Sequence, residues 1–302
     1  MSLTKSQIVN DLKIMGIAKD DIVNVKASLL EIGYIKGGAN TLIEALLECV
    51  GQNGTIISDS FVNVYSPWSI KFWSNIVTQT TPSYAGALAN AMITFPGSFR
   101  SNHPVQKFSL IGKEAEYLAG NHTSSAYAYD ILRIIAEKGG KNLKIGSDEK
   151  VPGVGTTHVA IGIAKIRQKR LLRGVRYKNR KGVVTSFYLN WSGGCMEAFY
   201  QLNEKYKMRS GAILKLGNIG SAKAKLTSMK DTLELELYEI KRDINGFLRC
   251  GNQDCLTCSL TWENNRDPIS SVIIRALKSK DIRLVYRILK LLIFGRYPFK
   301  AG

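Results

Sequence analysis

His158 has the residue type and the position that proton-transfer chemistry requires. Residues 153–156 form a glycine-containing loop, Gly-Val-Gly-Thr, and Thr157 and His158 follow it at the start of a predicted helix. The positive end of a helix dipole lowers the pKa of an imidazole, which keeps the ring neutral and able to accept a proton. An amine that attacks an acyl donor must lose a proton, so His158 is a candidate general base, with Thr157 beside it. The alternative is a histidine with a purely structural role.

A glycine-containing loop near the N-terminus could hold a ligand that carries phosphate or a thiol arm. Residues 25–39 lead from a predicted strand into a helix, and this segment contains Gly37 and Gly38. These glycines would allow a ligand to approach the backbone N–H groups at the start of the helix. The geometry suits a pantetheine arm or a pyrophosphate, although a simple tight turn uses the same residues.

A second candidate ligand-binding segment places a guanidinium, a hydroxyl and an imidazole in one short turn. Arg100, Ser101 and His103 supply these groups. An arginine can bind a phosphate through two parallel hydrogen bonds, so Arg100 is a candidate phosphate ligand. The alternative is that Arg100 and His103 only hydrogen-bond the backbone of their own turn.

Three cysteines near the C-terminal end of the chain follow the pattern Cys250-x4-Cys255-x2-Cys258. Thiolates at this spacing can bind zinc, with Cys195 or a water molecule as the fourth ligand. The spacing is also similar to that of plant-type ferredoxins, but the sequence has no fourth cysteine further along the chain. The other interpretation is three reduced thiols in a surface loop.

The elements that must position these groups can be predicted from capping residues and periodicity. We expect helices over residues 4–15, 41–50 and 222–240, with strands at residues 22–25 and from residue 54. The order strand, loop, helix, strand is typical of an α/β fold in layers, with a central mixed β-sheet flanked by helices. The sequence thus predicts an α/β layered sandwich.

The domain organisation is predicted as one α/β domain over residues 1–280 and a basic amphipathic helix over residues 281–302. In this last segment Leu284, Ile288 and Leu291 share one helical face, while Arg283 and Arg287 lie on another. Such a helix can lie on an anionic membrane surface. The alternative is a terminal helix that packs on its own core or on a partner in a homodimer.

The composition restricts the class of protein. The chain has 302 residues, with 42 Lys and Arg against 24 Asp and Glu, which leaves a formal net charge of +18. Such a field attracts anions, and a basic run over residues 165–181 could contact a phosphate, a membrane or only solvent. The sequence shows no leader peptide and no transmembrane run, and its five cysteines are an odd number. We therefore expect a cytoplasmic protein, with peripheral membrane contact through the terminal helix as an option.

Taken together, the motifs resemble the aminoglycoside 3-N-acetyltransferase family of antibiotic N-acetyltransferases. The resemblance covers residues 4 to 260 and rests on the order and spacing of several short motifs. These are Ser28-Leu29, Gly33, Gly37-Gly38-Ala39, Gly54-Thr55, Arg100-Ser101, His103-Pro104, Thr157-His158 and the stretch 217–222.

What the resemblance implies is direct transfer of an acetyl group from acetyl-CoA to an amino-sugar nitrogen, with His158 as the base. Asp59 and Glu197 are the candidate carboxylates for orienting His158. The cofactor contacts would come from the two loops, and Ser28, Leu29, Gly37, Gly38 and Ser101 would line the pantetheine channel. The full set of expected cofactor contacts is Lys26, Ser28, Leu29, Ile35, Lys36, Gly37, Gly38, Arg100, Ser101, His103 and Lys107.

Departures from the family pattern bear on the acceptor. Lys26 stands where the family usually has His, Lys107 where it usually has Ser, and Ile161 where it usually has an acidic residue. These changes and the net positive charge favour an amino sugar in a neutral or acidic molecule over a polycationic antibiotic. A nucleotide- or lipid-linked sugar of bacterial surface-polysaccharide assembly is the expected acceptor.

Three alternatives remain open from the sequence. The first is an aminoglycoside antibiotic as acceptor. The second is an inactive member of the family. The third is a basic protein that binds nucleic acid without being an enzyme, although no zinc finger, RNA-binding aromatic motif or helix-turn-helix signature favours it.

Overall fold

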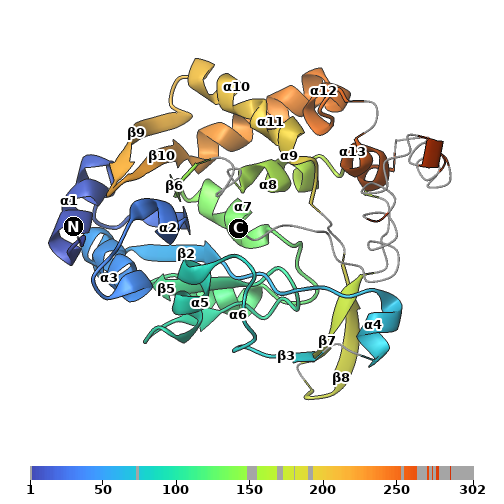
Figure 1. Ribbon diagram of the computed structural model, residues 1–302, viewed down its shortest axis with the longest axis horizontal. Helices are drawn as coiled ribbons and strands as arrows, with labels where there is room; N and C mark the ends of the chain where they lie inside the picture. The colour runs from blue at the N-terminus through green and yellow to red at the C-terminus, as the bar shows by residue number, and fades with distance from the viewer. Residues whose placement is uncertain are drawn as a thin grey trace.

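The computed structural model describes residues 2–72, 75–147, 155–168, 173–179, 181–189, 193–252 and 255–263, with the single positions 271, 274, 277, 278 and 286. Its centre is a seven-stranded mixed sheet (Figure 1) with the strand order β4-β5-β2-β1-β6-β10-β9. β2, β1 and β6 are parallel, and the outer strands that flank them run antiparallel. The strands are β1 (Ile22–Ala27), β2 (Thr55–Asp59), β4 (Phe99–Arg100), β5 (Phe108–Gly112), β6 (Lys141–Ile145), β9 (Ile213–Ile219) and β10 (Ala222–Ser228).

Helices cover both faces of this sheet, which confirms the predicted α/β layered architecture. One face packs against α1 (Lys5–Ile14), α3 (Gly38–Val50) and α5 (Ala87–Thr94). The other face packs against α6 (Ala115–Asn121), α7 (Asp130–Glu137), α8 (Thr156–Ile163) and α11 (Met229–Arg242). The shorter helices are α2 (Leu29–Ile32), α4 (Pro67–Phe72), α9 (Met196–Tyr200), α10 (Leu202–Met208), α12 (Ile244–Leu248) and α13 (Leu256–Thr261).

The two faces of the central strands differ in polarity. In β1 and β6 the residues Val23, Val25 and Leu143 belong to the core under α1 and α3. Asn24 and Asn142 alternate with them and hydrogen-bond each other, with 2.8 Å between Nδ2 of Asn24 and Oδ1 of Asn142. Because successive strand residues point to opposite faces, the polar residues of these strands lie on the side of α7, α8 and α11. That side therefore offers polar groups at the sheet surface.

Local sequence signals explain the first helices and one wrong boundary. Thr4 caps α1 through a capping box with Gln7, as expected for a helix over residues 4–15. The expected helix over residues 222–240 is wrong in its first seven residues, because residues 222–228 form strand β10 and α11 begins at Met229. Residues 222–226 alternate Ala or Leu with Lys, and these residue types favour a helix, but pairing with β6 and β9 makes the segment a strand. Ser228 then caps α11 through its side chain.

A small second sheet lies at the opposite end of the molecule from α1 (Figure 1). It consists of β3 (Ile76–Val77), β7 (Gly174–Lys178) and β8 (Val184–Tyr188), in the order β3-β7-β8. The basic run over residues 165–181 is therefore partly a strand, with Arg173 buried beside it.

The predicted C-terminal helix over residues 281–302 lies outside the described residues apart from Tyr286, which is exposed. Its membrane or dimer contacts stay predictions. Among the residues that the structure describes, no helix is both long enough and apolar enough to cross a bilayer.

Candidate active site

A buried hydrogen-bond network fixes the start of α8. Gly155 precedes the helix, and a Cβ atom at that position would lie 2.4 Å from Cδ1 of Leu132, so only glycine fits there. The Oγ1 atoms of Thr156 and Thr157 donate to Oε1 of Glu236 on α11, at 3.2 Å and 2.7 Å. The hydroxyl of Tyr206 donates to the same oxygen at 2.5 Å. These contacts hold the first turn of α8, and with it His158, in a defined position.

Glu236 is fully buried, and burial raises its pKa to about 8, against the opposing effect of the hydrogen bonds from Tyr206, Thr157 and Thr156. The carboxyl group is therefore largely protonated at neutral pH. In this state it adds no negative charge near His158. Glu236 thus acts as a positioning residue, and the sequence pattern gave no indication of it.

Aromatic rings hold the His158 imidazole on two sides. The ring of Tyr129 stacks on it, with 4.5 Å between the ring centroids and an angle of 28°. Phe199 of α9 presents an edge-to-face contact at 5.6 Å. The hydroxyl of Tyr127 donates to the backbone carbonyl of His158 at 2.9 Å. The residue as a whole is half-buried and its Nδ1 atom is enclosed. A ligand that exchanges a proton with the ring would therefore have to do so at Nε2.

A row of charged side chains crosses the sheet on the His158 side. Lys26 of β1 is in register with Lys144 of β6, which is in register with Lys225 of β10. Residues directly opposite each other on neighbouring strands share a face, so the three lysines lie side by side. On the other side, Nζ of Lys26 lies 2.9 Å from a carboxylate oxygen of Asp59 at the end of β2. Asp59 pairs with Lys26 at one end of the row, and the charge of Glu31 also acts on Lys144.

The charges in this row affect one another and the imidazole. Burial, followed by the positive charge of Lys26, lowers the pKa of His158 to about 3. Burial, with the charges of Lys225 and Lys26, lowers the pKa of Lys144 to about 7, and Glu31 opposes this shift. The imidazole is therefore neutral throughout the neutral pH range, as the sequence predicts. The cause is burial, with the charge of Lys26, in place of the helix dipole expected from the sequence. In the sequence, the only indication of this row is that each of the three strands carries a lysine among the positions that alternate with its apolar residues.

The first predicted cofactor loop lies directly beyond these strand ends. Ser28 and Leu29 follow Lys26 by two and three residues and are partly exposed, whereas Ile35 is buried. Lys36, Gly37 and Gly38 are exposed at the start of α3. The structure therefore places most of this predicted set around one accessible helix start.

The start of α3 differs from the sequence prediction. Gly37 is the N-cap and has φ 89°, and Gly38 has φ 65°. The sequence predicts a helix that begins near Thr41, with Asn40 or Thr41 as its cap. Thr41 instead lies inside α3 and donates its hydroxyl proton to the carbonyl of Lys36 at 2.7 Å. A Cβ atom at Gly37 would lie only 2.3 Å from Oγ1 of Thr41. Both the positive φ and this close contact therefore favour glycine at position 37.

The second predicted cofactor segment is packed inside the protein. Arg100 donates to the carbonyls of Gln79, Thr81 and Ser60, and Nε donates to the hydroxyl of Ser60. Burial lowers the pKa of Arg100 to about 10. These contacts favour a structural role for Arg100. Its partners belong to other segments of the chain, whereas the structural alternative expects them in its own turn.

The remaining residues of that turn are equally enclosed. Ser101 accepts a hydrogen bond from the N–H of Phe108 at 3.0 Å and is fully buried. Lys107 is 4% exposed and donates to the carbonyl of Ser101 at 2.9 Å. Burial, then the charge of Arg100, lowers the pKa of Lys107 to about 7. Nδ1 of His103 accepts from the backbone N–H groups of residues 105 and 106, as the structural alternative predicts.

The three histidines belong to one chain of ring contacts. His103 stacks on His122 at 4.9 Å, and His122 contacts Phe108 at 5.6 Å. Phe108 contacts Tyr129 at 6.3 Å, and Tyr129 stacks on His158. The turn that contains His103 therefore contacts the His158 site indirectly, through this series of packed rings.

The two carboxylates expected near His158 have other surroundings. Asp59 forms the ion pair with Lys26, and Glu197 is exposed on α9. Asp59 thus lies beside the site, and the described contacts connect it to His158 through Lys26. A catalytic role for Asp59 or Glu197 stays a prediction.

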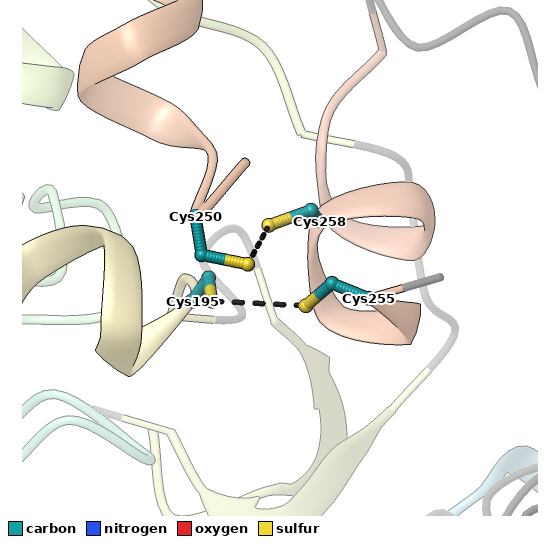
Figure 2. A group of neighbouring side chains, drawn as sticks. All are labelled: Cys195, Cys250, Cys255 and Cys258. Carbon is teal, nitrogen blue, oxygen red and sulfur yellow. Dashed lines mark hydrogen bonds between the residues drawn. The ribbon is translucent and has the colours of Figure 1, made fainter. Parts of the chain in front are cut away.

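The cysteines come together as the spacing suggested. Figure 2 shows Cys195 facing Cys250, Cys255 and Cys258, with all four sulfur atoms turned toward a common centre. Cys195, named from the sequence as one option for a fourth ligand, completes the group.

The fold and the site together define an α/β protein in which a neutral histidine at a helix start faces charged groups at the ends of parallel strands. The family model described as aminoglycoside 3-N-acetyltransferase matches residues 25–237. The chain belongs to this family.

Individual relatives agree with this assignment. The chain is 29% identical over 187 residues to aminoglycoside N(3)-acetyltransferase IX of Micromonospora chalcea, which covers 56% of this chain and 66% of that protein. It is 32% identical over 136 residues to the aminoglycoside N(3')-acetyltransferase-like protein YokD of Bacillus subtilis, covering 39% of this chain and 50% of the relative. The chain thus spans about half to two thirds of the length of these relatives.

Solved structures share the fold. The structure of AAC-VIa bound to sisomicin has a TM-score of 0.70 at 24% identity and covers 80% of this chain and 98% of its own. The structure of AAC-IIIb with CoASH has a TM-score of 0.68 at 23% identity, with the same coverage of 80% and 98%.

Proposed function

We propose that this protein transfers an acetyl group from acetyl-CoA to an amino group of an aminoglycoside. Membership of the family supports the reaction class, and the family's name supports the acceptor class. The observation that carries the proposal is the position of His158, which is neutral, half-buried and close enough to Lys26 to feel its charge, two residues before the accessible loop that follows β1. An aminoglycoside acceptor thus takes the place of the surface-polysaccharide sugar that the sequence leads us to expect.

The chemistry needs one base and no enzyme nucleophile. The amine nitrogen attacks the thioester carbonyl carbon, and the C–S bond breaks as the C–N bond forms. His158 accepts the proton that the nitrogen loses, and the leaving thiolate is protonated to give the CoA thiol. A neutral imidazole of low pKa is a weak base, so it takes the proton as the C–N bond forms, when the nitrogen has become more acidic.

The residues present suit coenzyme A on the loop after β1. The accessible start of α3 offers backbone N–H groups and the side chain of Lys36 to phosphate groups. Leu30 and Tyr34, in the same loop, are 82% and 75% exposed and could cover an apolar part of a ligand. The loop begins two residues after Lys26, whose charge acts on His158. A thioester reaching inward from this loop would therefore meet the strand ends beside the imidazole.

A second candidate acceptor is an amino sugar that carries an acidic group. Three lysines form the row Lys26, Lys144 and Lys225, against two nearby carboxylates, Asp59 and Glu31. This net positive charge is unfavourable for a polycation. The same row would stabilise a carboxylate or phosphate on the acceptor. This observation keeps the acidic amino sugar as an alternative within the same reaction class.

An acceptor panel tests both candidates. We would mix the purified protein and acetyl-CoA with sisomicin, gentamicin, a nucleotide-linked amino sugar or buffer alone, and measure thiol release and acetylated product. The proposal expects equal amounts of thiol and N-acetylated aminoglycoside, and no release without an acceptor. Product from the nucleotide-linked sugar alone would favour the second candidate. Thiol release that is independent of every amine would overturn the proposed reaction.

A further inference from the structure

Four of the five cysteines meet in one place, from segments about 60 residues apart in the chain. Cys195 and Cys255 directly precede α9 and α13, Cys250 follows α12 and Cys258 lies within α13. Their Sγ atoms all lie within 4.8 Å of one another. Figure 2 shows the sulfur atoms converging from the two sides of a shared centre. The fold, more than local spacing, creates this cluster.

Two of the six distances between the sulfur atoms match a single tetrahedral ion, and the other four are at most 4.8 Å. The Sγ atoms of Cys195 and Cys255 are 3.7 Å apart, as are those of Cys250 and Cys258. Zinc–thiolate bonds of about 2.3 Å in a tetrahedron place neighbouring sulfur atoms about 3.8 Å apart. A disulfide would need about 2.05 Å, so both pairs are reduced and separate. A four-iron cluster binds each thiolate to a different iron, which spreads the sulfur atoms further than one ion does.

We propose that Cys195, Cys250, Cys255 and Cys258 bind one zinc ion as a structural site. Four protein thiolates fill the tetrahedral coordination shell, so no position is left for a substrate or a water molecule. The site joins α9 to α12 and α13, which are helices of only five and six residues. Short helices of this kind gain little stability from their own hydrogen bonds, so a metal cross-link is an effective way to hold them.

The zinc site also supports the wall of the His158 site. Cys195 lies one turn before Phe199, whose ring contacts the imidazole. Phe199 also contacts Phe247 of α12 at 6.4 Å, and the indole N–H of the fully buried Trp262 donates to the carbonyl of Leu248 at 3.1 Å. The ion would thus fix the two segments whose aromatic side chains pack beside His158. Its role is indirect, since no cysteine of the cluster contacts the imidazole ring in the described contacts.

Metal analysis of the untagged protein, purified without chelators, tests the proposal. We expect about one zinc per chain, because a closed four-thiolate site retains its ion through purification. The variants Cys250→Ser and Cys258→Ser should lose most of this zinc. Cys49→Ser is the matched control, because Cys49 is buried in α3 on the other face of the sheet and should not change the zinc content.

A second measurement covers variants that fail to fold. Wild-type protein freed of metal and given Co²⁺ alone should develop the absorption bands of tetrahedral cobalt with thiolate ligands, and zinc should displace them. Less than about a tenth of an equivalent of zinc in folded wild-type protein, with none taken up on addition, would overturn the proposal. Iron in place of zinc, or equal zinc in Cys250→Ser and wild type, would overturn it as well. None of these measurements depends on acetyl transfer, so the proposed reaction can fail without affecting this result.

Discussion

His158 and His103 are two histidines in one chain of packed rings, and they differ in how far a ligand could reach them. Burial is the main cause of a low pKa in both, about 3 for His158 and about 2 for His103. His103 is fully buried, and its Nδ1 atom is occupied by two backbone N–H groups. His158 is partly exposed at a helix start beside Lys26. A lowered pKa therefore marks burial, and access to a ligand distinguishes the candidate base.

The largest effect should come from removing the imidazole at the exposed end of this chain of rings. His158→Ala should lower kcat by about 10²–10⁴-fold, the usual contribution of a general base, while the affinity for acetyl-CoA stays close to that of wild type. Single-turnover kinetics and calorimetric titration with acetyl-CoA would measure the two quantities. If His158→Ala kept the kcat of wild type, His158 would be a structural histidine like His103, and its proposed role as the base would be wrong.

The buried histidine should affect stability and leave the chemistry largely intact. His103→Ala leaves the N–H groups of Val105 and Gln106 without their acceptor, which should cost about 1–3 kcal/mol per buried donor in the free energy of unfolding. His103→Asn keeps an acceptor oxygen and should lose less. Denaturant unfolding measures both variants, and kcat per folded molecule is the comparison with His158. A loss of kcat in folded His103→Asn as large as that of His158→Ala would contradict the structural role.

The smallest effect concerns the carboxyl group that positions α8. The pKa of Glu236 is raised to about 8, so between its ordinary pKa of 4.5 and about 8 the folded protein keeps a proton that the unfolded chain has released. The free energy of unfolding should therefore fall as the pH rises through this window. Glu236→Gln keeps the acceptor oxygen and cannot ionise, so its Tm should fall less than that of wild type between about pH 5 and pH 8.

Thermal unfolding at the two pH values provides the measurement for Glu236→Gln. Glu204→Gln is the matched control, because Glu204 lies on the exposed surface in an ion pair with Lys207. The control should keep the pH dependence of wild type. Equal pH dependence in wild type and Glu236→Gln would show that this carboxyl group has an ordinary pKa.

The sequence predicts those parts of the site that depend on residues adjacent in the chain. Thr157 and His158, and the glycines Gly37 and Gly38, are local signals. The structure places both pairs at helix starts, of which the start of α3 is exposed and the start of α8 is buried up to His158. The strand Ala222–Ser228 is different, because only its pairing with β6 and β9 decides against a helix. The α/β layers themselves follow from the alternation of predicted strands and helices.

The rest of the site depends on contacts that no local pattern reveals. Glu236 reaches Thr157 from 79 residues away, and the lysine row exists only because three strands align in register. Arg100 has a residue type that suits phosphate, but the carbonyls that occupy it belong to segments distant in sequence. The four-cysteine cluster lies between these cases, since the sequence indicates three members and the fold adds Cys195.

Rescue of His158→Ala by added imidazole tests the proton-acceptor role most directly, because a small base can enter the space that the truncated side chain leaves. With acetyl-CoA and sisomicin saturating, the product rate should rise with the concentration of neutral imidazole and show no dependence on imidazolium. A rate that follows imidazolium, or a variant as fast as wild type before any imidazole is added, would contradict the assignment of His158 as the base.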